Sequence, residues 1–306
     1  MYSIRKKKVA VQTTGEKIAD ESFPLTVIRI LGKPYLRTTA LRCVASILRH
    51  FFFLQYRAAL LPGRIPVSKV DHPLDHKIPF LPGKVNTYLD FIAFWVRPLG
   101  FLIKSCGRGA LEPVRDFLET MGDLYAWAAL VYGKNLSTTE RPFYIGRPRF
   151  LLIHAMDPHL MCIPSLHVMV VIRTYTLFRE IAKLMGEGER FAGQAEELRL
   201  GALEITEAVL YIKQHSVNCI SAAMYAMTRF DPALFPPIEA ERFASGIFAD
   251  TKKAGKADGD EIRHEIRGYI LSLYRRFLYE GESSDDWTKP LLSFLKGKGH
   301  SRIYDA

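Results

Sequence analysis

Two basic residues and two histidines in the middle of the chain have types and spacings suited to phosphoryl chemistry. Lys134 is followed, after six residues, by Arg141-Pro142, and Pro164-Ser165-Leu166-His167 then runs directly into an apolar stretch. His215 closes a Lys-Gln-His sequence 48 positions after His167. Fixed cations and preorganised N–H donors stabilise the charge on phosphoryl oxygens most strongly in the transition state. The pattern is therefore suited to a site that binds phosphate or another anion.

The individual residue types suit particular tasks in such a site. Ser165 stands at the expected start of a helix, where free N–H groups and the helix dipole attract anions. The alternative for the same serine is an ordinary N-cap. Lys134 and Arg141 would supply positive charge, and arginine adds a bidentate fork. An imidazole can act as nucleophile or as acid because its pKa lies near neutrality.

The order of these motifs resembles the signature of the type 2 phosphatidic acid phosphatase superfamily. That signature is Lys-x6-Arg-Pro, then Pro-Ser-x-His, then Ser-Arg-x5-His-x3-Asp. The sequences Pro-Ser-Leu-His-Val and Lys-Gln-His are most similar to those of its inositol phosphorylceramide synthase-like branch. The resemblance covers residues 70–228. It implies that His215 is the nucleophile and forms a phosphohistidine, and that His167 protonates the departing alcohol. Lys134, Arg141 and Ser165 would bind the phosphate.

The third motif departs from the family pattern at two places. Ala208-Val209 replaces Ser-Arg, and Cys219 replaces the aspartate that would orient the nucleophile. A thiol is a weak hydrogen-bond partner and cannot stabilise an imidazolium as a carboxylate does. We therefore expect the orienting role to pass to Glu207 or to Asn218. These departures leave open a catalytically weakened or inactive relative that acts as a binding or structural protein, or an accidental match in a soluble helical domain.

The expected activity is phosphoester hydrolysis or phosphoryl-headgroup transfer, with a lipid as the favoured substrate and another phosphoester as the alternative. A formal charge of +10 implies attraction to anions, and no nucleic-acid module accompanies it. Protein cations would neutralise the phosphate, so neither a metal nor another cofactor is required. His154, Asp157 and His159 suggest a turn more readily than a metal site.

Hydrophobic periodicity predicts helices throughout the chain, and strand alternation is scarce. The expected helices cover residues 38–61, 85–106, 112–133, 165–183, 198–227, 261–279 and 287–295. The predicted fold is therefore all-α, a helical bundle of the type 2 phosphatidic acid phosphatase kind with a small helical C-terminal extension. The expected divisions are a peripheral basic segment (1–35, including Arg5 to Lys8), the bundle (36–229), and a linker with the extension (230–306).

The hydropathy of the chain bears on its place in the cell. The longest uncharged runs, Pro158 to Ile172 and Gln214 to Thr228, have 15 residues each, and a membrane-spanning helix needs about 20. Because a lipid is the favoured substrate, we expect membrane association, either integral or peripheral, with a soluble cytoplasmic protein as the alternative.

Overall fold

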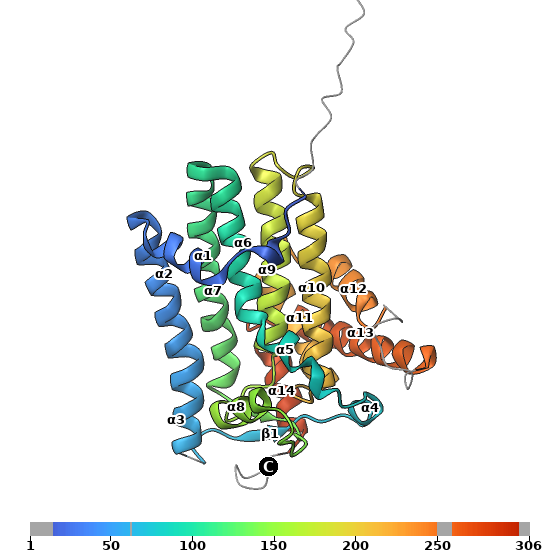
Figure 1. Cartoon of the computed structure of the whole chain (residues 1–306). Coiled ribbons are helices and arrows are strands. Elements are labelled where there is room, and N and C mark those ends of the chain that lie inside the picture. Colours follow the sequence, from blue (N-terminus) through green and yellow to red (C-terminus); the bar gives the residue numbers. More distant parts are fainter. Residues whose placement is uncertain (1–14, 62, 250–258, 300–306) are drawn as a thin grey trace, which may run out of the picture.

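The computed structural model describes residues 15–61, 63–249 and 259–299, which form an assembly of helices with two short strands (Figure 1). The structure is 72% helix and 3% strand, so the all-α prediction is confirmed. The short helices are η1 (Ile18–Asp20), the π-helix η2 (Leu48–Phe53), η3 (Pro82–Lys84) and η4 (Gly107–Ala110). The α-helices and strands are α1 (Phe23–Leu31), α2 (Pro34–Ile47), α3 (Leu54–Leu60), β1 (Val67–Lys69), α4 (Pro73–Lys77), α5 (Val85–Leu89), α6 (Phe91–Cys106), α7 (Leu111–Tyr132), β2 (Leu136–Thr138), α8 (Pro148–Met156), α9 (Leu166–Leu184), α10 (Ala192–Tyr211), α11 (Val217–Phe230), α12 (Pro237–Gly246), α13 (Asp260–Glu282) and α14 (Lys289–Gly297).

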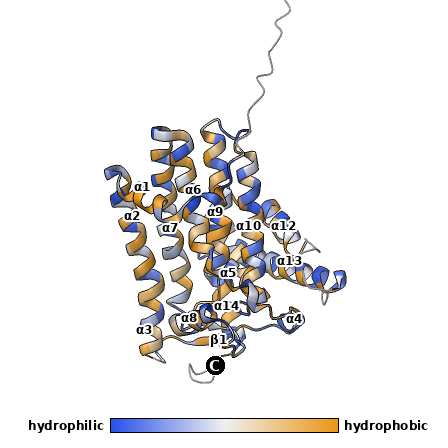
Figure 2. Ribbon diagram, in the orientation of Figure 1, coloured by the Kyte–Doolittle hydropathy of each residue, from blue (hydrophilic) through white to orange (hydrophobic). Residues whose placement is uncertain are grey.

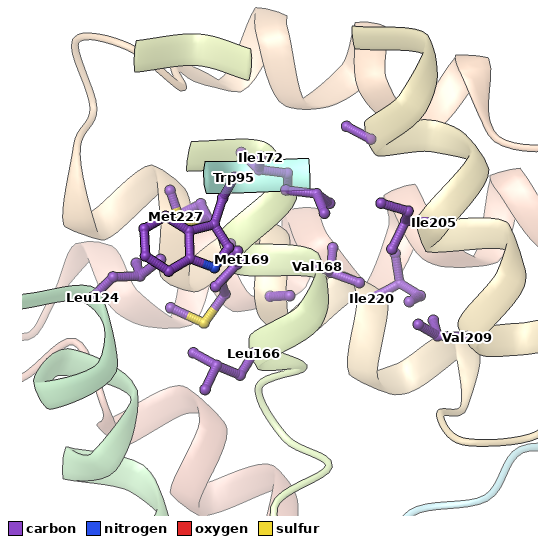
Figure 3. Packing of buried hydrophobic residues seen from close by; sticks show 14 of the residues in the cluster. Trp95, Leu124, Leu166, Val168, Met169, Ile172, Ile205, Val209, Ile220 and Met227 are labelled. Carbon is purple, nitrogen blue, oxygen red and sulfur yellow. The ribbon is translucent and has the colours of Figure 1, made fainter. Parts of the chain in front are cut away.

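Helix α9 is the central element of the bundle. It contacts α6, α7, α10 and α11, and most of its side chains are buried because these helices surround it. Val168, Met169 and Ile172 of α9 lie among Trp95, Ile205, Ile220 and other core residues (Figure 3). The first residues of α9 are therefore fixed by the core of the protein.

Two predicted helices are each divided in the structure. The stretch 198–227 breaks between α10 and α11, so the prediction of one continuous helix there is wrong. Lys213 has a φ of 58°, and Ser216 then starts α11 by accepting the backbone N–H of Asn218. The break places His215 in a tight turn. The stretch 85–106 is likewise divided at Asp90 into α5 and α6.

The N-terminal helices form one side of the molecule. Helices α2, η2 and α3 follow one another without interruption over residues 34–60, and α2 and η2 pack on α7. Leu36, Ala40 and Cys43 are buried on the side that faces the core. Helix α1 packs on α6, and Ile30 is buried. The described part of residues 1–35 thus contributes to the core and is not wholly peripheral, whereas residues 5–8 lie outside the described residues.

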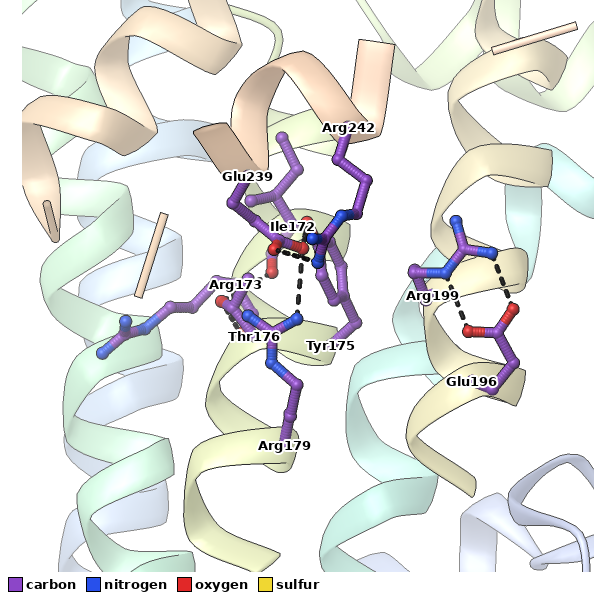
Figure 4. Close-up of polar contacts among 9 residues, drawn as sticks. All are labelled: Ile172, Arg173, Tyr175, Thr176, Arg179, Glu196, Arg199, Glu239 and Arg242. Atoms are coloured by element: carbon purple, nitrogen blue, oxygen red, sulfur yellow. Dashed lines mark hydrogen bonds and ion pairs between the residues drawn. The ribbon is translucent and has the colours of Figure 1, made fainter. Parts of the chain in front are cut away.

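The C-terminal part packs directly on the bundle. The stretch 230–246, expected as a linker, contains α12, and the buried Glu239 binds it to α9 by accepting hydrogen bonds from Tyr175 and Arg179 (Figure 4). Arg242, on α12 itself, also donates to Glu239. Helix α13 packs on α11, where the Ser221 hydroxyl donates to the carbonyl of Ile270. One hydrophobic cluster includes residues of all three predicted segments. Residues 250–258, part of the predicted linker, lie outside the described residues.

The two strands pair in parallel, with Val67 opposite Leu136 and Lys69 opposite Thr138. Strand β2 also holds the segment before α9, because Ser137 exchanges backbone hydrogen bonds with Leu160 and Cys162. Within the described residues, no helix is both long enough and apolar enough to cross a membrane.

Candidate phosphate-binding site

His167 and His215 meet at the end of the bundle where α9 begins. His167 is the second residue of α9, and His215 lies in the turn between α10 and α11. Nε2 of His215 lies 3.4 Å from Nδ1 of His167, and the ring centroids are 5.5 Å apart. The structure therefore brings together the two histidines that the sequence motifs single out.

Aromatic side chains hold the His167 ring in place. The ring centroids of Tyr88 and Phe91 lie 4.5 Å and 4.4 Å from that of His167. These residues come from α5 and α6, on either side of the division at Asp90. The surroundings of His167 thus come from α5 and α6 as well as from α9, and the imidazole is half-buried among these three helices.

Ser165 is the N-cap residue of α9, but its side chain does not cap the helix. Its hydroxyl bonds none of the first N–H groups of α9. Its own N–H donates to the carbonyl of Cys219 at 3.4 Å, which ties the start of α9 to α11. The ordinary N-cap alternative therefore does not describe this serine, and the first turn of α9 keeps N–H groups that could bind an anion.

Three buried polar atoms around the histidine pair have no hydrogen-bond partner among the described residues. They are Oγ of Ser165, Nε2 of Gln214 and Nδ1 of His215. The three residues are at most 7% exposed. Buried polar atoms are nearly always paired with protein or water, so each exception calls for an explanation. All three belong to the two segments that meet at the histidine contact, and a polar ligand bound there would satisfy them.

The Pro-Ser-Leu-His segment is held from three directions. The Tyr132 hydroxyl donates to the carbonyl of Pro164 at 2.5 Å. The Ile163 N–H donates to Oγ of Ser137 at 2.7 Å. Together with the Ser165 bond to α11, these contacts fix the backbone before His167. Because they involve α7, β2 and α11, the position of the site depends on the whole bundle.

The turn that carries His215 is held by the segment around α4. The Asp75 carboxylate accepts the N–H of Val217 at 2.9 Å, at the positive end of α11, and also the N–H of His72. The ammonium of Lys213 donates to the carbonyls of Asp75 and Ile78. Lys213 thus helps to position the turn.

Arg141 lies beside the turn. Its guanidinium donates to Oε1 of Gln214 at 3.4 Å and to the carbonyl of Asp157 at 3.3 Å, and it lies 4.0 Å from the Asp157 carboxylate. It also lines a cavity of about 320 Å³ together with Lys69, His154 and His159. Neither His167 nor His215 lines this cavity. Arg141 therefore connects the cavity to the residue next to His215.

Lys134 has contacts that lead away from the histidine pair. Its ammonium donates to Oγ1 of Thr288 at 3.3 Å and pairs with the Asp286 carboxylate at 3.6 Å. The side chain is 53% exposed. Lys134 follows the end of α7, and the acidic side chain at the entrance to α14 attracts it. Of the predicted phosphate ligands, Lys134 is thus the one that the structure does not bring to the others.

The predicted orienting residues also bond elsewhere. Glu207 accepts the backbone N–H of Phe248 at 2.7 Å. Asn218 donates to the carbonyl of Val70 at 2.9 Å and accepts the hydroxyl of Tyr269 at 2.6 Å. Burial raises the pKa of the Cys219 thiol well above its usual range, so the thiol stays neutral. No carboxylate among the described residues bonds Nδ1 of His215.

Burial keeps both histidines neutral at pH 7. It lowers the pKa of His167 to about 4 and that of His215 well below 6.5. The neighbouring His167 lowers the pKa of His215 further, whereas Asp157 and the carbonyl of Cys162 act in the opposite direction. The pKa of Asp157 itself lies well below its ordinary value because His159 and Arg141 outweigh its burial. A neutral imidazole has the free lone pair that a nucleophile needs.

Three residues of the site were not predicted from the sequence. Gln214 stands directly before His215 in the Lys-Gln-His sequence, but the motif gives it no role, whereas Asp75 lies 140 positions before His215 and carries no signal. The sequence favours a turn over a metal site for Asp157, and its ion pair with Arg141 comes from the fold.

Comparisons with known proteins find no family that matches the chain, no matching curated protein and no matching solved structure.

Proposed function

We propose that this protein hydrolyses phosphoesters or transfers a phosphoryl headgroup through a phosphohistidine at His215. The observation that carries the proposal is a group of buried atoms on Ser165, Gln214 and His215 that find no partner among the described residues, at the start of α9 and at the contact of two neutral histidines. A phosphoryl group offers acceptor oxygens to the hydroxyl, the amide and the helix N–H groups. It offers an electrophilic phosphorus atom to the imidazole.

In the proposed reaction, a ring nitrogen of His215 attacks phosphorus as the bond to the ester oxygen breaks. His167 donates a proton to that oxygen, so the alcohol leaves neutral. Water, or the hydroxyl of an acceptor alcohol, then attacks the phosphohistidine while His167 removes its proton. His215 is released, and the product is inorganic phosphate or a new phosphoester. Arg141 and the N-terminus of α9 stabilise the charge on the transferred group.

The spacing of the histidines sets a condition on this reaction. An attacking nitrogen needs about 3–3.5 Å to the phosphorus atom, which is already the whole separation of 3.4 Å between the two imidazoles. In-line transfer therefore requires the rings to move apart when the phosphoryl group enters. The phosphate charge would also raise the pKa of His167 and give it the proton that it donates.

A lipid substrate is favoured by the surroundings of the Arg141 cavity. Phe143 lines the cavity and is 88% exposed, and Ile145, Leu151 and Leu152, which follow it in the sequence, are also exposed. A cavity lined by Lys69, Arg141 and an exposed aromatic side chain suits a phosphate that is attached to a hydrocarbon chain. Membrane association is part of this proposal.

A second candidate function is a weakened relative that binds phosphoesters without turning them over. The observation that favours it is the unpaired Nδ1 of His215, which lacks the carboxylate that usually orients a catalytic imidazole. Loss of such a carboxylate costs about 10⁴-fold in another nucleophilic enzyme. The same site would then hold a ligand.

Phosphate release from a panel of lipid and soluble phosphoesters separates the two functions. For the enzyme, we expect His215→Ala to lose at least about 10³-fold in rate, as nucleophile removal does elsewhere. His264→Ala, which changes an exposed histidine of α13, is the matched control and should retain full activity. Equal rates in His215→Ala and wild type would contradict the proposed enzymatic function. An inactive wild type that still binds a phosphoester would support the weakened relative.

A further inference from the structure

The outer side of the helical stretch from residue 34 to 60 is an unusual surface. Large hydrophobic side chains on it are exposed at intervals of three or four residues, which places them in one line along the helix. We call this line the apolar stripe; it consists of Leu41, Val44, Leu48, Phe52, Tyr56 and Leu60. Leu60 is 78% exposed and Leu48 is 53% exposed. Helices α2 and α3 accordingly show much hydrophobic colouring in Figure 2.

The apolar stripe lies opposite a second apolar line that already has a partner. Leu36, Ala40 and Cys43 are buried on the side of α2 that packs on α7, and Ala58 of α3 is buried as well. The helix is therefore apolar on two sides, and only one of them is covered by other residues that the structure describes. Helix α1 adds Leu25 and Ile28, which are 52% and 63% exposed, to the same end of the molecule. Contiguous exposed hydrophobic surface of this kind usually marks an interaction site.

Arginines border the apolar stripe. Arg42, Arg49 and Arg57 follow each other at intervals of seven and eight residues and are all exposed, so they lie along one side of the helix. The surrounding sequence is free of acid: residues 22–70 contain eight lysines and arginines and no aspartate or glutamate. Elsewhere on the surface, basic side chains commonly pair with acidic ones, as Arg199 does with Glu196 (Figure 4).

We propose that this side of the molecule, α2 to α3 with its arginines, docks on an anionic lipid surface. Exposed hydrophobic side chains beside arginines are the two components that hold an amphipathic helix at a membrane surface. A second copy of the chain is a poorer occupant, because pairing the face with itself would bring its arginines together without acidic partners. The proposal concerns binding of the protein to a membrane surface and does not depend on the phosphoester chemistry.

Vesicle flotation with the full-length protein tests the proposal. We expect wild type to float with vesicles that contain phosphatidylserine and to be released by high salt, which screens the arginines. Leu48→Glu and Arg49→Glu should each weaken binding by roughly tenfold or more, because about fivefold is expected per charge near the surface. Leu184→Glu and Lys289→Glu, on α9 and α14, make the same chemical changes at other exposed positions and should bind as wild type does.

Thermal unfolding of each variant checks that it is folded. Absence of wild type from the anionic vesicle fraction would overturn the proposal, as would equal flotation of Leu48→Glu and wild type. Self-association that is lost in Leu48→Glu, without vesicle binding, would instead assign the face to a second copy. Binding of an acidic protein helix without vesicle binding would likewise overturn it.

Discussion

At the scale of single residues, the site combines two neutral histidines with buried polar atoms of Ser165, Gln214 and His215. These atoms have no hydrogen-bond partner among the described residues. The sequence was sufficient to select His167, His215, Ser165 and Arg141, because their types and order form a recognisable pattern. The same reasoning could not place Lys134, whose ammonium turns to Asp286. A long flexible side chain in a loop follows whichever carboxylate the fold brings near, and the motif does not contain that information.

Ser165→Ala separates stability from function at this scale. The hydroxyl is buried and has no hydrogen-bond partner in the part of the chain that the structure describes, so its removal should cost no hydrogen bond and relieve a desolvation penalty. We expect the variant to be as stable as wild type or more stable, by up to about 1 kcal/mol. Phosphoester turnover should fall, because the phosphate loses a donor. Urea unfolding and phosphate release measure the two effects, and a clear loss of stability would show that the hydroxyl has a partner in the unliganded protein.

The low pKa of His167 predicts acid sensitivity. A histidine with a pKa of about 4 in the folded state and about 6.5 when unfolded binds fewer protons when folded. Its contribution to stability is therefore complete above pH 6.5 and is lost as the pH falls toward 4. The pKa of Asp157 is also lowered. Its protonation affects stability only below the ordinary pKa of an aspartate, so Asp157 does not contribute to the change in stability between pH 6.5 and pH 4.

Unfolding midpoints between pH 7 and pH 4 test this dependence. In His167→Gln, which cannot gain the proton, stability should fall less steeply with acid than in wild type. Parallel pH profiles for the two proteins would mean that the imidazole is not held neutral by the fold.

At the scale of elements, the site depends on where helices begin and end. Periodicity predicted most of the helices, including α7 and α9, but it joined α10 to α11 across the turn that carries His215. The apolar pattern continues through that turn because both helices are buried. The local signal for the break is Ser216, an N-cap residue whose significance depends on its tertiary surroundings.

Asp75 tests how the turn is held. Asp75→Ala removes the acceptor of the Val217 and His72 N–H groups. We expect a loss of about 1–2 kcal/mol in the free energy of unfolding, together with a fall in activity as His215 loses its position. Glu265→Ala, which removes only the exposed pair with Lys77, is the control and should change neither. Full activity in Asp75→Ala would show that the turn is held without the α4 segment.

At the scale of the whole molecule, one hydrophobic cluster contains residues of all three predicted segments. The composition after Phe230 suggested a linker and a small extension, yet α12 and α13 complete the core around α9 and α11. When a helix carries charged and turn-forming residues on one side, its composition alone does not reveal that the other side is buried. The kind of bundle implied by the family resemblance stays a prediction.

The packing of α13 can be tested with a pair of aromatic residues. Phe277 is fully buried, whereas Tyr279, two positions later, is 77% exposed. Phe277→Ala should cost about 3–5 kcal/mol, and Tyr279→Ala should stay within about 0.5 kcal/mol of wild type. Denaturant unfolding of the complete chain measures both. A small effect at Phe277, or a separate unfolding transition for the C-terminal part, would argue for an independent extension.

The central claim is that His215 carries the phosphoryl group during turnover. Its most direct test is to mix the protein with a phosphoester substrate, quench under alkaline conditions that preserve phosphohistidine, and locate the modification by peptide mass spectrometry. We predict one phosphoryl group on the peptide that contains His215, and none in His215→Ala. Turnover without phosphorylation of His215, or with the phosphoryl group on another residue, would contradict the claim.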